Sequence, residues 1–155
     1  MTVIANSTLL IRRIGELRRR REALVDRQER LRSTLPEWAL APLQLVGMTA
    51  TEIKALMNDL SEAERKAGLD EAERELDLLD QNIEELENLL LTTPARTVDG
   101  IQAVLDMAVA RFREQTVTDP NDVFYDYGDA RTLRFLERAA DDLRMLMQDT
   151  HRAAS

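Results

Sequence analysis

The sequence predicts an all-α protein: an elongated antiparallel coiled coil or helical bundle with a small C-terminal helical part. Apolar residues recur at steps of three and four along every long segment, which is the period of a helix with one buried face. Aromatic residues make up only 4% of the chain and glycines number 5, so strands and tight hairpins are poorly supplied.

The first predicted helix begins at Ser7 or Thr8, either of which can cap it, and ends near residue 31. Ile14 occupies one line of its seam, but the later positions of that line are Arg21 and Gln28. Leucines recur every seven residues along the other line: Leu10, Leu17, Leu24 and Leu31. A half-polar seam is a poor core by itself, so we expect this helix to need a partner, from its own chain or from another copy.

An apolar connecting segment follows at residues 33–48. Pro36 and Pro42 limit any helix there to a turn or two, and Thr34 with Glu37 resembles a capping box. A short helix over residues 35–41 is therefore expected. The segment is too apolar for a solvated linker, so we expect it to fold over the end of the bundle.

The next helix starts at a capping box formed by Thr49 and Glu52. The apolar pattern slips by two residues at Gly68, which favours a break or sharp kink there over a kinked continuous helix. The pattern then resumes as the strongest seam of the chain. Its members are Leu69, Ala72, Leu76, Leu79, Ile83, Leu86 and Leu90.

Pro94 ends that helix, and two shorter helices are expected after it. Thr97 caps the first, and its seam is Ile101, Leu105, Ala108 and Phe112. A loop over residues 115–129 leads to Asp129, which caps the last helix; its seam is Leu133, Leu136, Ala140, Leu143 and Met147. We therefore divide the chain into a coiled-coil arm, 1–93, and a C-terminal helical hairpin, 94–155, in one structural unit.

Opposite charges favour pairing of the two arm helices. The first carries nine arginines against four acidic residues, an excess of five positive charges, whereas residues 49–91 hold thirteen acidic and four basic residues, a charge of -9. Exposed ion pairs contribute only ~0–1 kcal/mol each, so the apolar seams supply stability and the charges select the partner. The same pairing between two chains would make a homo-oligomer.

Two features suggest an alternative, a regulator that acts on nucleic acid or its binders. One is the basic run Arg18, Arg19, Arg20 and Arg21, although at most two of four consecutive residues share a helix face. The other is a row of carboxylates at helical spacing that could mimic DNA phosphates: Glu73, Asp77, Asp80, Glu84 and Glu87. The net charge of -8 argues against bulk attraction to nucleic acid, and we expect the arginines to be solvated or paired within the chain.

Catalytic and metal chemistry is poorly supplied. The chain has no cysteine and one histidine, His151, which removes thiolate catalysis, cysteine-based zinc sites, most histidine-ligated metal sites and histidine-based triads. Glu84, Glu85 and Glu87 lack the Glu-x-x-His partner of a di-metal bundle. Residues 119–124 begin like a calcium loop but carry Val123 and Phe124 at the fifth and sixth positions. We expect no enzyme activity, no cofactor and no metal.

The sequence also predicts where the protein resides. No apolar run approaches the ~20 residues that span a bilayer, and no basic stretch precedes the short apolar segment within residues 1–10. We therefore expect a cytoplasmic protein without a membrane partner.

Four aromatic residues are candidate partner contacts: Trp38, Phe124, Tyr125 and Tyr127. Such residues are enriched in binding hot spots, and they also serve as anchors that hold a loop against a bundle. The predicted function is that of a non-enzymatic helical interaction or scaffold protein that self-associates through its heptad seams.

The segment from Thr93 to Gly100 reads T-P-A-R-T-V-D-G. It resembles the T-P-A-x-T-x-x-G joint of short alphaproteobacterial proteins that are often encoded near prophage genes. In these proteins a charged helical arm precedes the joint, and a helix, an acidic-aromatic loop and a C-terminal helix follow it. The resemblance covers roughly residues 86–146. It implies a bacterial, cytoplasmic, mobile-element context and carries no functional residues.

Overall fold

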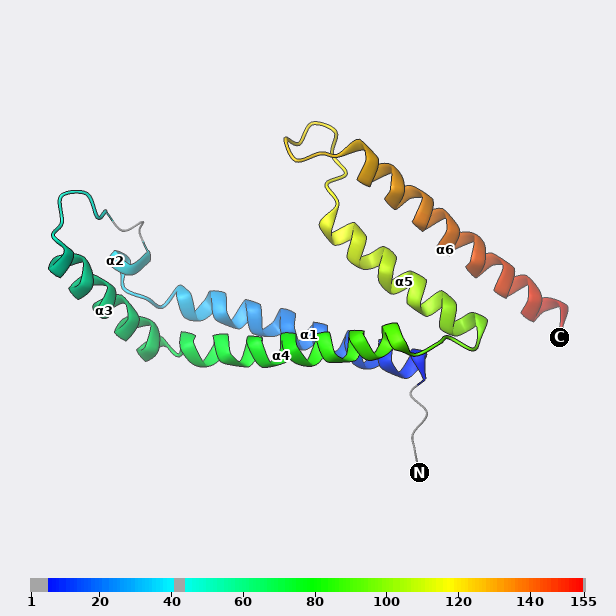
Figure 1. The fold of residues 1–155 in the computed structure, drawn as a ribbon, viewed down its shortest axis with the longest axis horizontal. Coiled ribbons are helices and arrows are strands. Elements are labelled where there is room, and N and C mark those ends of the chain that lie inside the picture. The colour runs from blue at the N-terminus through cyan, green and yellow to red at the C-terminus, as the bar shows by residue number, and fades with distance from the viewer. Residues whose placement is uncertain (1–5, 41–43, 155) are drawn as a thin grey trace, which may run out of the picture. The chain divides into compact units, whose positions relative to one another are not determined.

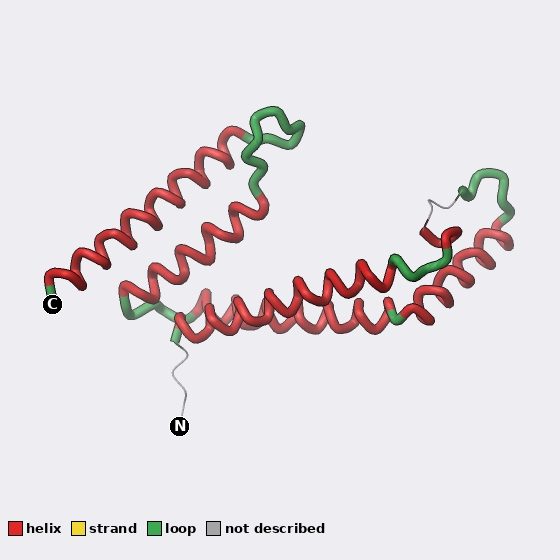
Figure 2. Tube along the Cα trace, turned by 180° about the vertical axis from the view of Figure 1, so that it is seen from behind, coloured by secondary structure: helices red, strands yellow, loops and turns green. Residues whose placement is uncertain are grey.

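The computed structural model describes residues 6–40 and 44–154. Every regular element in these ranges is a helix (Figure 2), which confirms the all-α prediction. In chain order the helices are α1 (Ser7–Arg32), α2 (Glu37–Leu40), α3 (Ala50–Ala67), α4 (Leu69–Thr92), α5 (Val98–Gln115) and α6 (Tyr127–Ala153). Within the same ranges no helix is long and apolar enough to cross a bilayer.

The described residues form two compact units, one made of 14–40 and 44–86 and the other of 6–13 and 87–154. The predicted division at residues 93 and 94 stays a prediction. In the first unit α1 and α4 lie side by side and run in opposite directions (Figure 1). Arg20, Arg21 and Arg27 of α1 form ion pairs with acidic residues of α4. A coiled-coil description of this pair stays a prediction.

The apolar seams of α1 and α4 are the buried lines of these helices. Ile14 is the most enclosed side chain, 1% exposed. All the predicted seam residues are buried except Leu31 and Leu86, which are half-buried. Arg21 is exposed and Gln28 is half-buried. The buried residues of the α1 seam are therefore mainly its leucines.

Helix α3 follows the predicted boundaries. Thr49 and Glu52 form the capping box, with the Thr49 N–H donating to the Glu52 carboxylate at 2.7 Å. At the other end Gly68 adopts φ +82°, a left-handed conformation that favours glycine, and its N–H donates to the Arg65 carbonyl. The break at Gly68 is therefore confirmed. The apolar face of α3 is only half-buried.

Three cap predictions are wrong. Asn6 caps α1, because its side-chain oxygen accepts from the Thr8 N–H at 2.9 Å while Ser7 already lies in the helix. Asp126 caps α6 by accepting from the Asp129 N–H, so this helix starts two residues before Asp129. The Thr34 hydroxyl donates to a carbonyl of α1 instead of joining a capping box with Glu37. For α1 and α6 a neighbouring polar side chain supplies the cap, whereas the Thr34 hydroxyl is used by the Leu31 carbonyl.

The connecting segment covers the bundle less than expected. Leu35 is buried, but Leu40 and Leu45 are exposed and Val46 is fully exposed. Helix α2 begins at Glu37, two residues after the predicted start; Ala41, its predicted end, lies outside the described residues, as does Pro42.

In the second unit α5 and α6 run antiparallel and pack along their length (Figure 1). Two ion pairs join them, Arg113–Glu137 at 2.8 Å and Arg144–Asp106 at 2.9 Å. Their core consists of Val109, Leu133 and Ala140, with Leu105, Phe112 and Leu136 packed around it. The predicted seam of α6 therefore faces α5.

The predicted seam of α5 is partly wrong. Gln102 and Val109 are buried where Ile101 and Ala108 were expected, and the latter two are exposed. The Gln102 amide donates to Asp106 and to the Ala140 carbonyl of α6. These hydrogen bonds allow a polar residue to occupy the buried face. Because Gln102 and Val109 take that face, the side chains of Ile101 and Ala108 are exposed.

Candidate functional site

The predicted basic run is largely occupied by contacts within the chain. Arg20 lies 3.1 Å from Glu75, which Arg27 also approaches at 3.8 Å. Arg21 donates to both carboxylate oxygens of Asp80. These pairs are the ones that opposite charges on the two segments predict. Their side chains are all at least 35% exposed, so each pair contributes ~0–1 kcal/mol.

The acidic row is also partly neutralised. Asp80 is held by Arg21, and the Glu87 carboxylate lies 2.7 Å from Arg111 of α5. Two of the five carboxylates therefore already form an ion pair with a guanidinium group. A mimic of DNA needs regularly spaced free charges on one face, and these pairs interrupt that spacing.

The candidate aromatic contacts differ in exposure. Phe124 is 82% exposed and Tyr127 is exposed as well, whereas Tyr125 is half-buried. Tyr125 is therefore the better candidate for an anchor that holds the loop against the helices, and Phe124 and Tyr127 are the better candidates for partner contacts. Trp38, 44% exposed, faces α3 across a hollow of about 490 Å³ that also involves Asp59 and Lys66.

The first turns of α6 carry a stacked cation. The guanidinium carbon of Arg131 lies 6.0 Å from the centre of the Tyr127 ring and 5.6 Å from that of Phe135. Both rings are exposed, and such contacts contribute ~0.5–1 kcal/mol at a surface. The result is a pre-ordered aromatic and basic face, which spacing along the sequence did not single out.

The calcium-like loop has ordinary turn chemistry. Asp119 accepts from the Asn121 N–H at 2.9 Å, and Asp122 accepts from the Phe124 N–H at 2.8 Å. These are Asx turns in which the carboxylates bind their own backbone. Across the described ranges no group of three potential ligands is arranged to hold a metal ion.

An apolar groove lies between the end of α4 and one face of α5. Leu91 of α4 and Ile101 of α5 line it and are 85% and 49% exposed. The hollow measures about 590 Å³, and Glu87 and Arg111 are the charged residues that line it. Its apolar lining consists of Leu90, Leu91, Ala95, Ile101, Val104, Leu105, Met107 and Ala108. The sequence signal for this groove was the excess of apolar residues on α5 beyond one seam.

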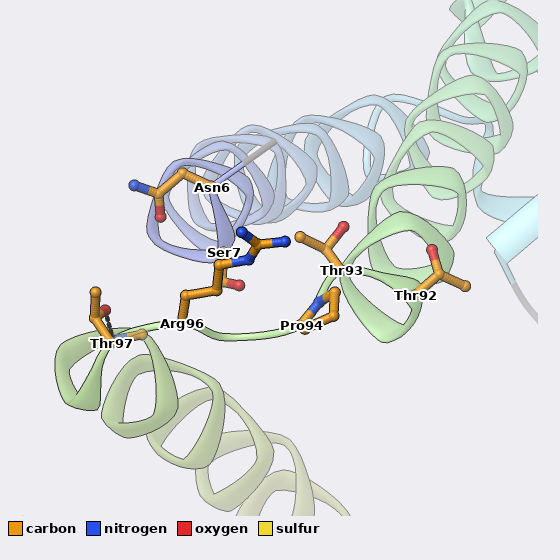
Figure 3. A pocket seen from close by; sticks show the side chains of 8 residues that line it. Asn6, Ser7, Thr92, Thr93, Pro94, Arg96 and Thr97 are labelled. Atoms are coloured by element: carbon orange, nitrogen blue, oxygen red, sulfur yellow. Dashed lines mark hydrogen bonds between the residues drawn. The ribbon is translucent and has the colours of Figure 1, made fainter. Parts of the chain in front are cut away.

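The joint between α4 and α5 explains the T-P-A-x-T-x-x-G sequence in physical terms. The Gly100 N–H donates to the Thr97 hydroxyl at 3.0 Å, which caps α5 as predicted (Figure 3). A Cβ at position 100 would lie 3.1 Å from that hydroxyl oxygen and 3.5 Å from the Ala95 Cβ. Glycine therefore fits the cap without displacing it.

A second hollow, of about 480 Å³, surrounds this joint. Asn6, Ser7, Thr93, Arg96 and Thr97 are among its lining residues (Figure 3). Ser7 and Arg96 are far apart in the sequence, and no pattern predicted that they would share a hollow.

Comparisons with known proteins assign no role to these sites. No protein-family model matches the chain, and no curated protein or solved structure matches it significantly.

Proposed function

We propose that this chain is a non-enzymatic helical interaction protein and that two copies associate through the apolar groove. The exposure of Leu91 carries this proposal. A leucine that is 85% exposed beside a groove with few polar residues leaves apolar surface in water, and covering such surface contributes ~25 cal/mol per Å². The proposal moves self-association away from the heptad seams, because those residues are mostly buried within one chain.

Charge favours a second copy as the occupant. The chain carries a net charge of -8, so two copies repel each other overall. In a symmetric dimer each residue near the axis meets its own equivalent. The charged residues that line the groove, Glu87 and Arg111, already neutralise each other at 2.7 Å, so this face adds little repulsion when two copies meet there.

The ion pairs of α1 weigh against the nucleic-acid alternative. Binding of duplex DNA by Arg20 and Arg21 requires them to leave Glu75 and Asp80, and those carboxylates would then face the phosphates. A titration of duplex DNA across a salt series tests the alternative. Tight binding with a steep salt dependence would favour the regulator over the interaction protein.

Sedimentation equilibrium of the full chain tests the dimer. We expect the wild type to dimerise and the variant Leu91→Glu/Ile101→Glu to remain monomeric, because each substitution places a charge in the apolar contact. Leu78→Glu is the matched control, since Leu78 is an exposed leucine on α4 away from the groove. A monomeric wild type, or equal weakening by both variants, would refute the groove as the interface.

A further inference from the structure

The hollow at the α4–α5 joint brings together the first turns of two helices. Asn6 and Ser7 belong to the start of α1, and Thr97 and Gly100 to the start of α5 (Figure 3). The first N–H groups of a helix have no partner within it and form the positive end of its dipole. The Thr8 and Gly100 N–H groups already donate to Asn6 and Thr97, so the two helix ends contribute the positive ends of their dipoles to the hollow, which favours an anion.

Arg96 adds a full positive charge to this hollow. Its side chain extends from the joint toward the first turn of α1 (Figure 3). In the part of the chain that the structure describes, Arg96 has no carboxylate partner, whereas Arg111, Arg113 and Arg144 of the same unit each have one. A guanidinium without a counter-ion in so acidic a chain is therefore available to a ligand.

Ser7 supplies an independent indication of a ligand. It is only 4% exposed, and its hydroxyl forms no hydrogen bond with any described residue. The fully enclosed side-chain polar atom without a partner among the described residues is Gln102 Oε1, so the Ser7 oxygen is accessible from the hollow that it lines. The hydroxyls of Thr92 and Thr93 differ, because both donate to the Leu89 carbonyl of α4. Ser7 is thus a donor that lines the hollow and remains unused.

Acidic residues do not oppose an anion here. Asp99 lies in the first turn of α5, but it lines a different hollow with Leu143 and His151. The described residues that line the joint hollow include no carboxylate.

The geometry points to an oxyanion-binding site at this joint, in which Arg96 supplies the charge and the Ser7 hydroxyl donates a hydrogen bond. A tetrahedral oxyanion, either free phosphate or the phosphate group of a small monoester, can enter a hollow of about 480 Å³ and accept hydrogen bonds from a guanidinium. The site is separate from the apolar groove, so it stands whether or not the protein dimerises.

Titration of the ¹⁵N-labelled chain with inorganic phosphate, followed by NMR, tests the site. We expect saturable shifts of the amides of Ser7, Thr97 and Gly100, beyond those caused by chloride at equal ionic strength. A second titration uses O-phosphoserine. Binding of either compound supports the site, and the tighter of the two shows whether the site prefers a free anion or a monoester.

Three variants locate the binding. Arg96→Gln should weaken phosphate by about tenfold or more, because a charged hydrogen bond is lost, and Ser7→Ala should weaken it less. Arg134→Gln is the control, since Arg134 is an exposed arginine of α6 outside the hollow. Shifts no larger than those with chloride, or equal affinity in Arg96→Gln and wild type, would overturn the proposal. Ser7→Ala keeps the test decisive if Arg96→Gln fails to fold.

Discussion

Arg21 of α1 binds both carboxylate oxygens of Asp80 in α4 through its Nε and Nη2 atoms, the second at 3.2 Å. A two-point contact fixes direction as well as distance. The hydrogen bond to Asp80 raises the pKa of Arg21 above its ordinary value. This pair therefore defines the register in which two antiparallel helices lie beside each other.

Reversing the charge of Arg21 alone should destabilise the protein, and reversing the charges of both Arg21 and Asp80 should restore part of the lost stability. Arg21→Glu places two carboxylates together, and we expect the free energy of unfolding to fall by about 1 kcal/mol. Adding Asp80→Arg should recover part of that loss. Urea unfolding of the single and double variants measures both effects. Arg19→Glu, a reversal at an exposed neighbour, should cost less, and a double variant no more stable than Arg21→Glu would contradict the pairing.

Two glycine substitutions should have opposite signs. Gly68→Ala forces an L side chain to φ +82°, and although its Cβ meets no atom within 4 Å, the backbone alone should cost ~1–2 kcal/mol. Gly15→Ala lies inside α1 with equally open space and should stabilise by about 0.5–1 kcal/mol. Thermal unfolding followed by circular dichroism compares them. A Gly68→Ala variant as stable as wild type would indicate that α3 and α4 can merge into one helix.

Truncation at Ile14 should reveal the importance of the buried seam. Ile14 is 1% exposed, and Ile14→Ala removes a buried side chain and leaves a cavity, at a cost of ~2–5 kcal/mol. Val25→Ala is the control, because Val25 is 40% exposed on the same helix and should change stability by about 0.5 kcal/mol at most. Chemical denaturation gives both values. Similar losses at the two sites would mean that the seam is not the main source of stability.

Acid should loosen the first turn of α3. The hydrogen bond from the Thr49 backbone lowers the pKa of Glu52 below its ordinary value of 4.5. Because this pKa is lower in the folded state than in the unfolded state, the stabilisation is present above pH 4.5 and is lost as pH falls through the folded pKa.

The Thr49 amide proton reports this loss directly. Its NMR shift should titrate with a midpoint below 4.5, and the titration should disappear in Glu52→Gln. A midpoint at or above that value would show that the capping box does not persist in solution.

The paired helices were the most predictable part of the fold. Leu17, Leu24 and Leu79 lie on heptad lines with polar neighbours, so periodicity alone identifies their buried face. Helix α5 was harder to predict, because it has apolar residues on several faces and its buried Gln102 depends on a carbonyl of α6. Periodicity cannot rank two apolar faces when the deciding contact comes from another helix.

The joint hollow was beyond prediction from sequence. The spacing of Thr97 and Gly100 indicated a helix cap, and the cap is present. That Ser7 and Arg96 share a hollow depends on how distant helix ends meet, which no local pattern encodes. Local rules therefore predicted the parts of the site and not their assembly.

The position of Trp38 gives the chain a built-in spectroscopic probe. It is the only tryptophan of the sequence, and it lies beside α3, away from the leucine seams. Its fluorescence on heating reports the contact between α2 and α3, whereas ellipticity reports total helix content. A red shift of emission that precedes the loss of ellipticity would show that this contact opens before the long helices melt.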